Sequence, residues 1–92
     1  MARYKIFADD IDEGRMICVH LTQLDENGKA VDPDARDVAY LAFPSWEFDK
    51  DLGSYMRSRK PVYDRARAIM QAGHPWNARK AAEKVQGHII EM

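Results

Sequence analysis

Cysteine and histidine are the residue types of a nucleophile and its general base, and one such pair lies close together in this chain. The only cysteine, Cys18, is two positions from His20 in the segment Arg15–Leu24, whose alternating apolar residues predict a strand. Side chains at positions i and i+2 of a strand share a face but stand roughly 6–7 Å apart, too far for a hydrogen bond. We therefore expect Cys18 to be a half-buried structural thiol and not half of a catalytic dyad.

The remaining candidates for chemistry are weaker. Four carboxylates cluster at positions 9–13, in the order Asp9, Asp10, Asp12 and Glu13. Their spacing differs from the calcium loop of an EF-hand, so they indicate a solvated acidic turn. The three histidines are scattered, without the paired spacing of a zinc site, and neither a glycine elbow nor a glycine-rich phosphate loop is present. The sequence therefore predicts a protein without enzymatic activity, metal or cofactor.

Binding chemistry is concentrated in Leu52–Lys84, where a local charge of +6 contrasts with a net charge of −1 for the chain. Guanidinium groups fork onto phosphates, and aromatic rings stack on unpaired bases. Three aromatic residues, Tyr55, Tyr63 and Trp76, are interleaved with the cations. The cations are the predicted residues for binding nucleic acid or a partner, namely Arg57, Arg59, Lys60, Arg65, Arg67, Arg79, Lys80 and Lys84.

Other interpretations of the charges remain open. Residues 1–50 carry a net charge of −5 and residues 51–92 one of +4, which predicts two poles unless the fold interleaves the halves. The cations would then be a solvated face, or would neutralise the acidic half. They also suit an acidic protein partner, and the acidic half itself could imitate a phosphate backbone.

A chain of 92 residues forms one domain, spanning residues 1–92, and is too short for a second. A single cysteine cannot form an intrachain disulfide, which is typical of a reducing cytoplasm. No apolar run approaches the roughly 20 residues that cross a bilayer. The N-terminal residues lack the long apolar segment of a secretory signal. We therefore expect a cytoplasmic domain without a membrane partner or a small-molecule substrate.

Apolar periodicity predicts strands first and helices afterwards. Strands are expected at Arg3–Ala8, Arg15–Leu24 and Asp37–Phe43, with Ile17, Val19 and Leu21 facing the core. A helix capped by Ser45 is expected next, because Phe48, Leu52, Tyr55 and Met56 form a helical stripe. A second helix would run from Pro61 to Gly73, and a third from the cap Asn77 towards Gly87. The segment His88–Met92 would be an edge strand or a frayed end.

This order predicts an α+β fold, with a small antiparallel sheet of three or four strands and two or three C-terminal helices packed on one face. A short α+β chain with segregated charges and no catalytic set resembles the small accessory proteins of phages, in particular the anti-CRISPR proteins that inhibit type I surveillance complexes. The hairpin around Asp25–Gly28 and the basic corner Arg57–Arg67 carry the resemblance, which spans the whole chain at the level of size and layout.

The resemblance implies a non-enzymatic inhibitor in the cytoplasm of a host cell. It would dock on a host ribonucleoprotein, made of protein and guide RNA, through the basic helical surface, and block nucleic-acid recruitment sterically. The alternative is an autonomous small RNA- or DNA-binding domain, although no helix-turn-helix, RRM or KH pattern is present.

Overall fold

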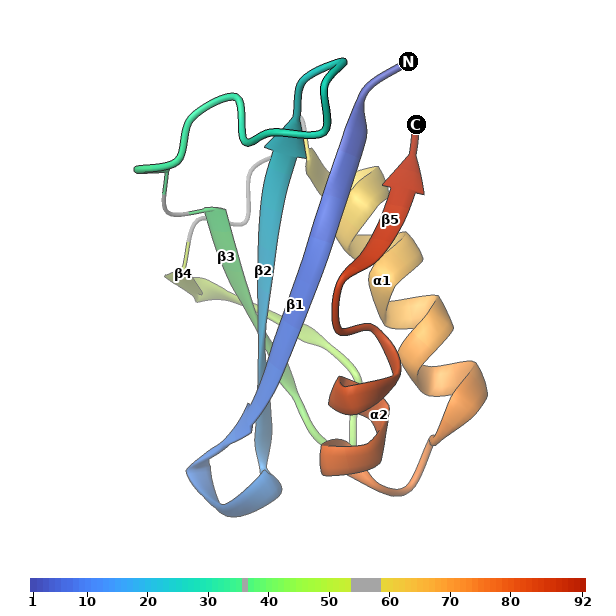
Figure 1. The fold of residues 1–92 in the computed structure, drawn as a ribbon. Coiled ribbons are helices and arrows are strands. Elements are labelled where there is room, and N and C mark those ends of the chain that lie inside the picture. Colours follow the sequence, from blue (N-terminus) through green and yellow to red (C-terminus); the bar gives the residue numbers. More distant parts are fainter. Residues whose placement is uncertain (36, 54–58) are drawn as a thin grey trace.

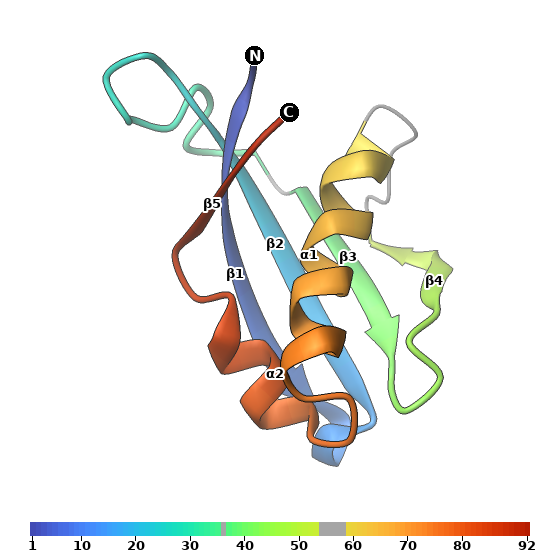
Figure 2. The same cartoon turned by 90° about the vertical axis from the view of Figure 1, so that its right-hand side faces the viewer.

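The computed structural model describes residues 1–35, 37–53 and 59–92. These residues form one antiparallel sheet, in the order β4-β3-β2-β1-β5, with two helices packed on one face (Figures 1 and 2). The strands are β1 (Arg3–Ile11), β2 (Met16–Leu24), β3 (Asp37–Ala42), β4 (Phe48–Gly53) and β5 (His88–Glu91). The helices are α1 (Lys60–Gly73) and α2 (Ala78–Lys84), and the short 3-10 segment η1 (Asp12–Gly14) joins β1 to β2.

The long hairpin of β1 and β2 is the centre of the sheet. Its pairing is continuous from Arg3 opposite Leu24 to Ile11 opposite Met16. Alternation of apolar residues places one face of both strands under the helices, because successive side chains of a strand point to opposite faces. The predicted core residues Ile17, Val19 and Leu21 are all buried, so this prediction is confirmed.

A tight turn follows β2, where the sequence predicts a hairpin. The backbone N–H of Gly28 donates to the carbonyl oxygen of Asp25 at 3.0 Å. The Asp25 carboxylate accepts from the backbone N–H of Asn27 at 2.8 Å. Gly28 adopts a φ of +79°, which glycine reaches without steric cost. The chain then runs through residues 29–35 before it returns as β3.

The segment Phe48–Gly53 is a strand and not the predicted helix. It pairs with β3, with Phe48 opposite Leu41 and Asp49 opposite Tyr40. The local preference of this short stripe for a helix is weaker than the gain from pairing with β3, whose backbone groups at the sheet edge need hydrogen-bond partners. Ser45 lies in a turn and caps no helix. Two members of the stripe, Tyr55 and Met56, lie outside the described residues.

The two predicted C-terminal helices are confirmed. Pro61 lies in the first turn of α1, and Gly73 is its last residue. The side chain of Asn77 caps α2 by accepting a hydrogen bond from the backbone N–H of Lys80 at 3.0 Å. Small residues of α2, such as Ala81 and Ala82, are buried against the sheet and α1. The α+β class is therefore confirmed, with five strands instead of three or four and two helices in the described part of the chain.

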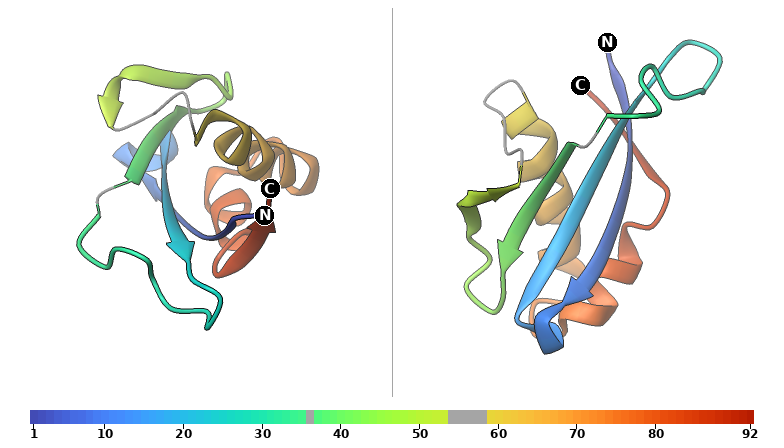
Figure 3. Two further views of the ribbon diagram at one scale, coloured as in Figure 1. Left: turned by 90° about the horizontal axis from the view of Figure 1, so that it is seen from above. Right: turned by 90° about the vertical axis from the view of Figure 1, so that its left-hand side faces the viewer.

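The last strand brings the end of the chain back to its beginning. Residues 88–91 pair with β1, where Ile90 lies opposite Tyr4, and Ile90 is buried. Figure 3 shows the helices on one side of the sheet and the two termini next to each other. The acidic β1–β2 connection and α2 lie at the same end of the molecule in Figures 1 and 2, so the oppositely charged halves interleave. In the described ranges, neither helix is long and apolar enough to span a membrane.

Candidate functional site

The structure places the seven described members of the eight predicted binding cations in distinct environments instead of one corner. Arg57 lies outside the described residues. Arg59 turns inward against the sheet, and Arg67 is only partly exposed. The others are exposed on the helices, namely Lys60, Arg65, Arg79, Lys80 and Lys84.

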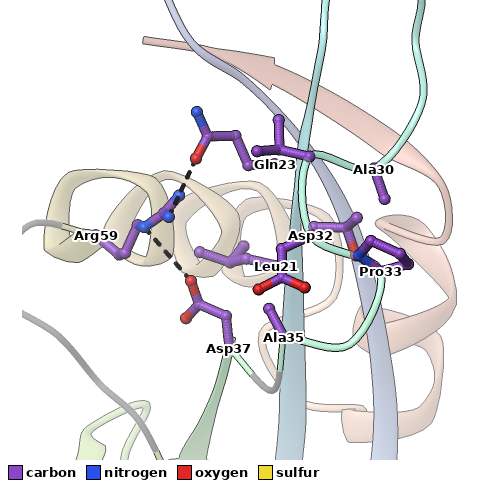
Figure 4. A pocket seen from close by; sticks show the side chains of 10 residues that line it. Leu21, Gln23, Ala30, Asp32, Pro33, Ala35, Asp37 and Arg59 are labelled. Atoms are coloured by element: carbon purple, nitrogen blue, oxygen red, sulfur yellow. Dashed lines mark hydrogen bonds and ion pairs between the residues drawn. The ribbon is translucent and has the colours of Figure 1, made fainter.

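Arg59 is held in a polar cluster where α1 begins. Its Nε pairs with the Asp37 carboxylate at 3.5 Å, and its Nη2 donates to Gln23 Oε1 at 3.2 Å (Figure 4). The guanidinium carbon lies 4.8 Å from the centre of the Tyr4 ring, in a cation–π contact. The side chains of Arg59 and Asp37 are only 22% and 13% exposed, so Arg59 is a structural link between the helix and the sheet.

Tyr63 completes this cluster from the first turns of α1. Its hydroxyl group donates to the Asp37 carboxylate at 2.5 Å. Burial, and then the hydrogen bond to Asp37 and its charge, raise the pKa of Tyr63 far above its ordinary value. The hydroxyl group therefore stays protonated and remains a donor. Because Tyr63 is fully buried, its predicted role in stacking on bases is excluded.

A pocket of about 330 Å³ borders this cluster beneath the connection between β2 and β3. Figure 4 shows Arg59 on one side of it and Asp32 and Pro33 on the other. The Nη1 atom of Arg59 is buried and has no hydrogen-bond partner in the part of the chain that the structure describes. The adjacent Tyr4 ring accounts for part of this, because an aromatic face accepts a weak N–H contact.

Arg67, like Arg59, makes its contacts with other residues of the chain. It shares the Asp64 carboxylate with Lys60, at 3.2 Å and 2.8 Å respectively. Its guanidinium carbon lies 5.0 Å from the centre of the Phe48 ring, and Nη1 donates to the carbonyl oxygen of Trp46 at 3.2 Å. Arg67 therefore ties α1 to β4 and to the turn before it.

A second group of predicted residues is exposed to solvent, in the turn before α2 and on α2 itself. Trp76 is 84% exposed in the turn before α2, and the cations of α2 follow it directly. Arg79 pairs with Glu83 at 3.3 Å, whereas Lys80 and Lys84 have no ion pair among the described residues. We refer to Trp76, Arg79, Lys80 and Lys84 as the α2 patch. The sequence predicted its members without showing that they separate from Arg59 and Arg67.

Cys18 and His20 are closer than strand spacing predicts. Their Sγ and Nε2 atoms lie 3.3 Å apart, within hydrogen-bond distance. The expectation of 6–7 Å was wrong because it ignored the length of the imidazole, which reaches back along the strand. Burial raises the pKa of the Cys18 thiol, a hydrogen bond with Tyr40 opposes this, and the Asp9 charge raises it further. The Cys18 thiol therefore stays protonated, whereas a nucleophilic cysteine needs a lowered pKa.

No group of three or more His, Cys, Asp or Glu side chains is placed to hold a metal ion within residues 1–35, 37–53 and 59–92. Comparison with known proteins gives no further guide: no protein-family model matches the chain, and no curated protein or solved structure matches it. The exposed surface is therefore the feature of the molecule that bears on function.

Proposed function

We propose that this chain is a non-enzymatic inhibitor of the phage-encoded kind, which docks on a host nucleoprotein through the α2 patch and blocks nucleic-acid recruitment sterically. The observation that carries the proposal is an 84% exposed tryptophan next to exposed cations. A small domain normally buries a tryptophan, and Trp46 of this chain is 6% exposed. Trp76 is the type of residue that anchors protein and nucleic-acid interfaces.

The resemblance to anti-CRISPR proteins names the partner to test, a type I surveillance complex. Target DNA capture by the purified complex would be followed by gel mobility with increasing amounts of this protein. We expect the wild-type chain to block capture, and W76A and the double variant K80E/K84E to need at least about tenfold more protein. The matched control is K29E, because Lys29 is an exposed cation in the connection after β2.

A second candidate function uses the same patch. An exposed tryptophan beside lysines also suits direct binding of single-stranded RNA or DNA. Fluorescence of the bare nucleic acid would then report binding whose affinity falls steeply with salt, and K80E/K84E would reduce that slope. Capture of target DNA that is unchanged by the wild-type protein contradicts the inhibitor. Bare nucleic acid bound equally by wild type and W76A contradicts a stacking role for Trp76.

A further inference from the structure

The free side of β5 is a second surface, independent of the proposed function. β5 is the last strand of the sheet on the side of β1, and no described strand covers its outer edge (Figures 1 and 3). Such an edge presents unpaired backbone N–H and C=O groups and is a template for another strand.

The pattern of hydrogen bonds between β1 and β5 identifies the residues of β5 whose backbone N–H and C=O groups point away from the sheet. Ala2 and Met92 exchange two backbone hydrogen bonds, each of 2.9 Å. In an antiparallel pair, residues that exchange two backbone hydrogen bonds recur at every second position. The backbone groups of Ile90 are therefore directed towards Tyr4 of β1. The backbone groups of Ile89 and Glu91 are therefore directed away from the sheet.

A groove runs beside this edge. Residues 88–92 form one wall and Arg65 of α1 forms the other, around a volume of about 340 Å³. Arg65 is exposed and makes no ion pair within the ranges that the structure describes, whereas Lys60 and Arg67 on the same helix share Asp64. A groove between an edge strand and a helix is the geometry in which domains bind extended peptides by strand addition.

We propose that an extended acidic segment of a partner protein adds to the sheet beside β5. Its backbone pairs with Ile89 and Glu91, and the residue opposite Ile90 places a carboxylate on Arg65. Side chains that alternate with it lie on the other face of the sheet, beside Ile89, which is 47% exposed. The matching peptide therefore alternates acidic and apolar residues.

A second copy of the chain fits this groove less well. Glu91 is the only carboxylate of β5, and it lies opposite Arg3, on the face of the sheet away from the helices. Two β5 strands paired with each other would therefore bring no side-chain carboxylate of β5 to either copy of Arg65. An acidic partner segment supplies such a carboxylate, which is why the charge favours it.

The test uses a fluorescent, acetylated peptide of alternating valine and glutamate, with binding followed by anisotropy and by amide chemical shifts. I89P removes an outward N–H without touching the ladder to β1, and I89A is its matched control with the N–H intact. We expect I89P and R65E to weaken binding at least about tenfold, and I89A and K80E to stay within about twofold. A valine–lysine peptide should bind at least about tenfold more weakly.

Several results would overturn the proposal. Equal affinities for I89P and I89A would show that backbone pairing at β5 is not used. Shifts confined to α2, or no binding at millimolar peptide, would remove the groove as the site. A wild-type dimer in sedimentation that becomes a monomer in I89P would assign the edge to a second copy. Amide spectra of each variant show that its fold is kept.

Discussion

At the scale of residues, the charges of this chain divide into those that hold the fold and those that face outward. Asp37 is the clearest member of the first group, because it accepts from Tyr63 and pairs with Arg59. Removing one partner of a largely buried ion pair leaves the other charge without compensation, which costs more than the pair itself contributes.

We predict that D37A lowers the free energy of unfolding by about 3 kcal/mol, because Arg59 and Tyr63 both lose their acceptor. D37N should cost less, since an amide oxygen still accepts from Tyr63. The measurement is urea unfolding followed by circular dichroism. E83Q is the matched control: it removes an exposed ion pair with Arg79 and should cost less than about 0.5 kcal/mol. A D37A midpoint equal to that of E83Q would contradict the role assigned to the cluster.

At the scale of elements, the outer edge of β1 is completed by a side chain that lies just before β5 begins. Gly87 donates its backbone N–H to the carbonyl oxygen of Ile6 at 2.8 Å. At Ala8, two residues further along β1, the side-chain amide of Gln86 makes the hydrogen bonds that the backbone of a neighbouring strand would otherwise make. Its oxygen accepts from the Ala8 N–H at 3.4 Å, and its nitrogen donates to the Ala8 carbonyl oxygen. The same nitrogen also donates to the carbonyl oxygen of Ala82 in α2 at 3.1 Å.

We predict that Q86A lowers the free energy of unfolding by about 1 kcal/mol, because the backbone N–H and C=O groups of Ala8 both lose the Gln86 amide as their partner. Hydrogen exchange of the Ala8 amide should accelerate about fivefold if it exchanges through the same opening. Q71A, at an exposed position of α1, is the control and should leave both quantities unchanged. Unaltered exchange at Ala8 in Q86A would show that the glutamine does not protect this edge.

Sequence patterns predicted most elements because their signals are local. Alternation fixed the faces of β2, and Pro61, Gly73 and Asn77 marked the helix ends. The strand at Phe48–Gly53 escaped prediction, since it depends on pairing with β3. The candidate site escaped for a similar reason: nothing local distinguishes Arg59, which finds Asp37 across the fold, from Lys80, which finds no carboxylate among the described residues.

At the scale of the whole molecule, the sheet pairs two strands from opposite ends of the sequence, β1 and β5. β1 lies between β2 and β5, so the backbone hydrogen bonds on one of its two sides depend on pairing with residues 88–91. Ile90 is 5% exposed in the core that β1, β2 and the helices share.

We predict that a chain ending at Gly87 loses at least about 3 kcal/mol of stability, because it exposes the edge of β1 and removes the buried side chain of Ile90. This is a large part of the stability of a small domain. Urea unfolding gives the loss. The matched control is E91A, which alters β5 without removing a buried side chain. An unchanged midpoint for the shortened chain would mean that β5 contributes little to the fold.

The reciprocal bonds between Ala2 and Met92 have a practical consequence for how the chain can be handled. A linker of a few residues would join the two ends into a circle without crossing the molecule. New ends could then be opened in the exposed connection at residues 26–29, where no core side chain would be disturbed. Such a circular permutant would leave the β5 groove clear of any label, whereas a tag attached next to Ala2 or Met92 would stand beside it.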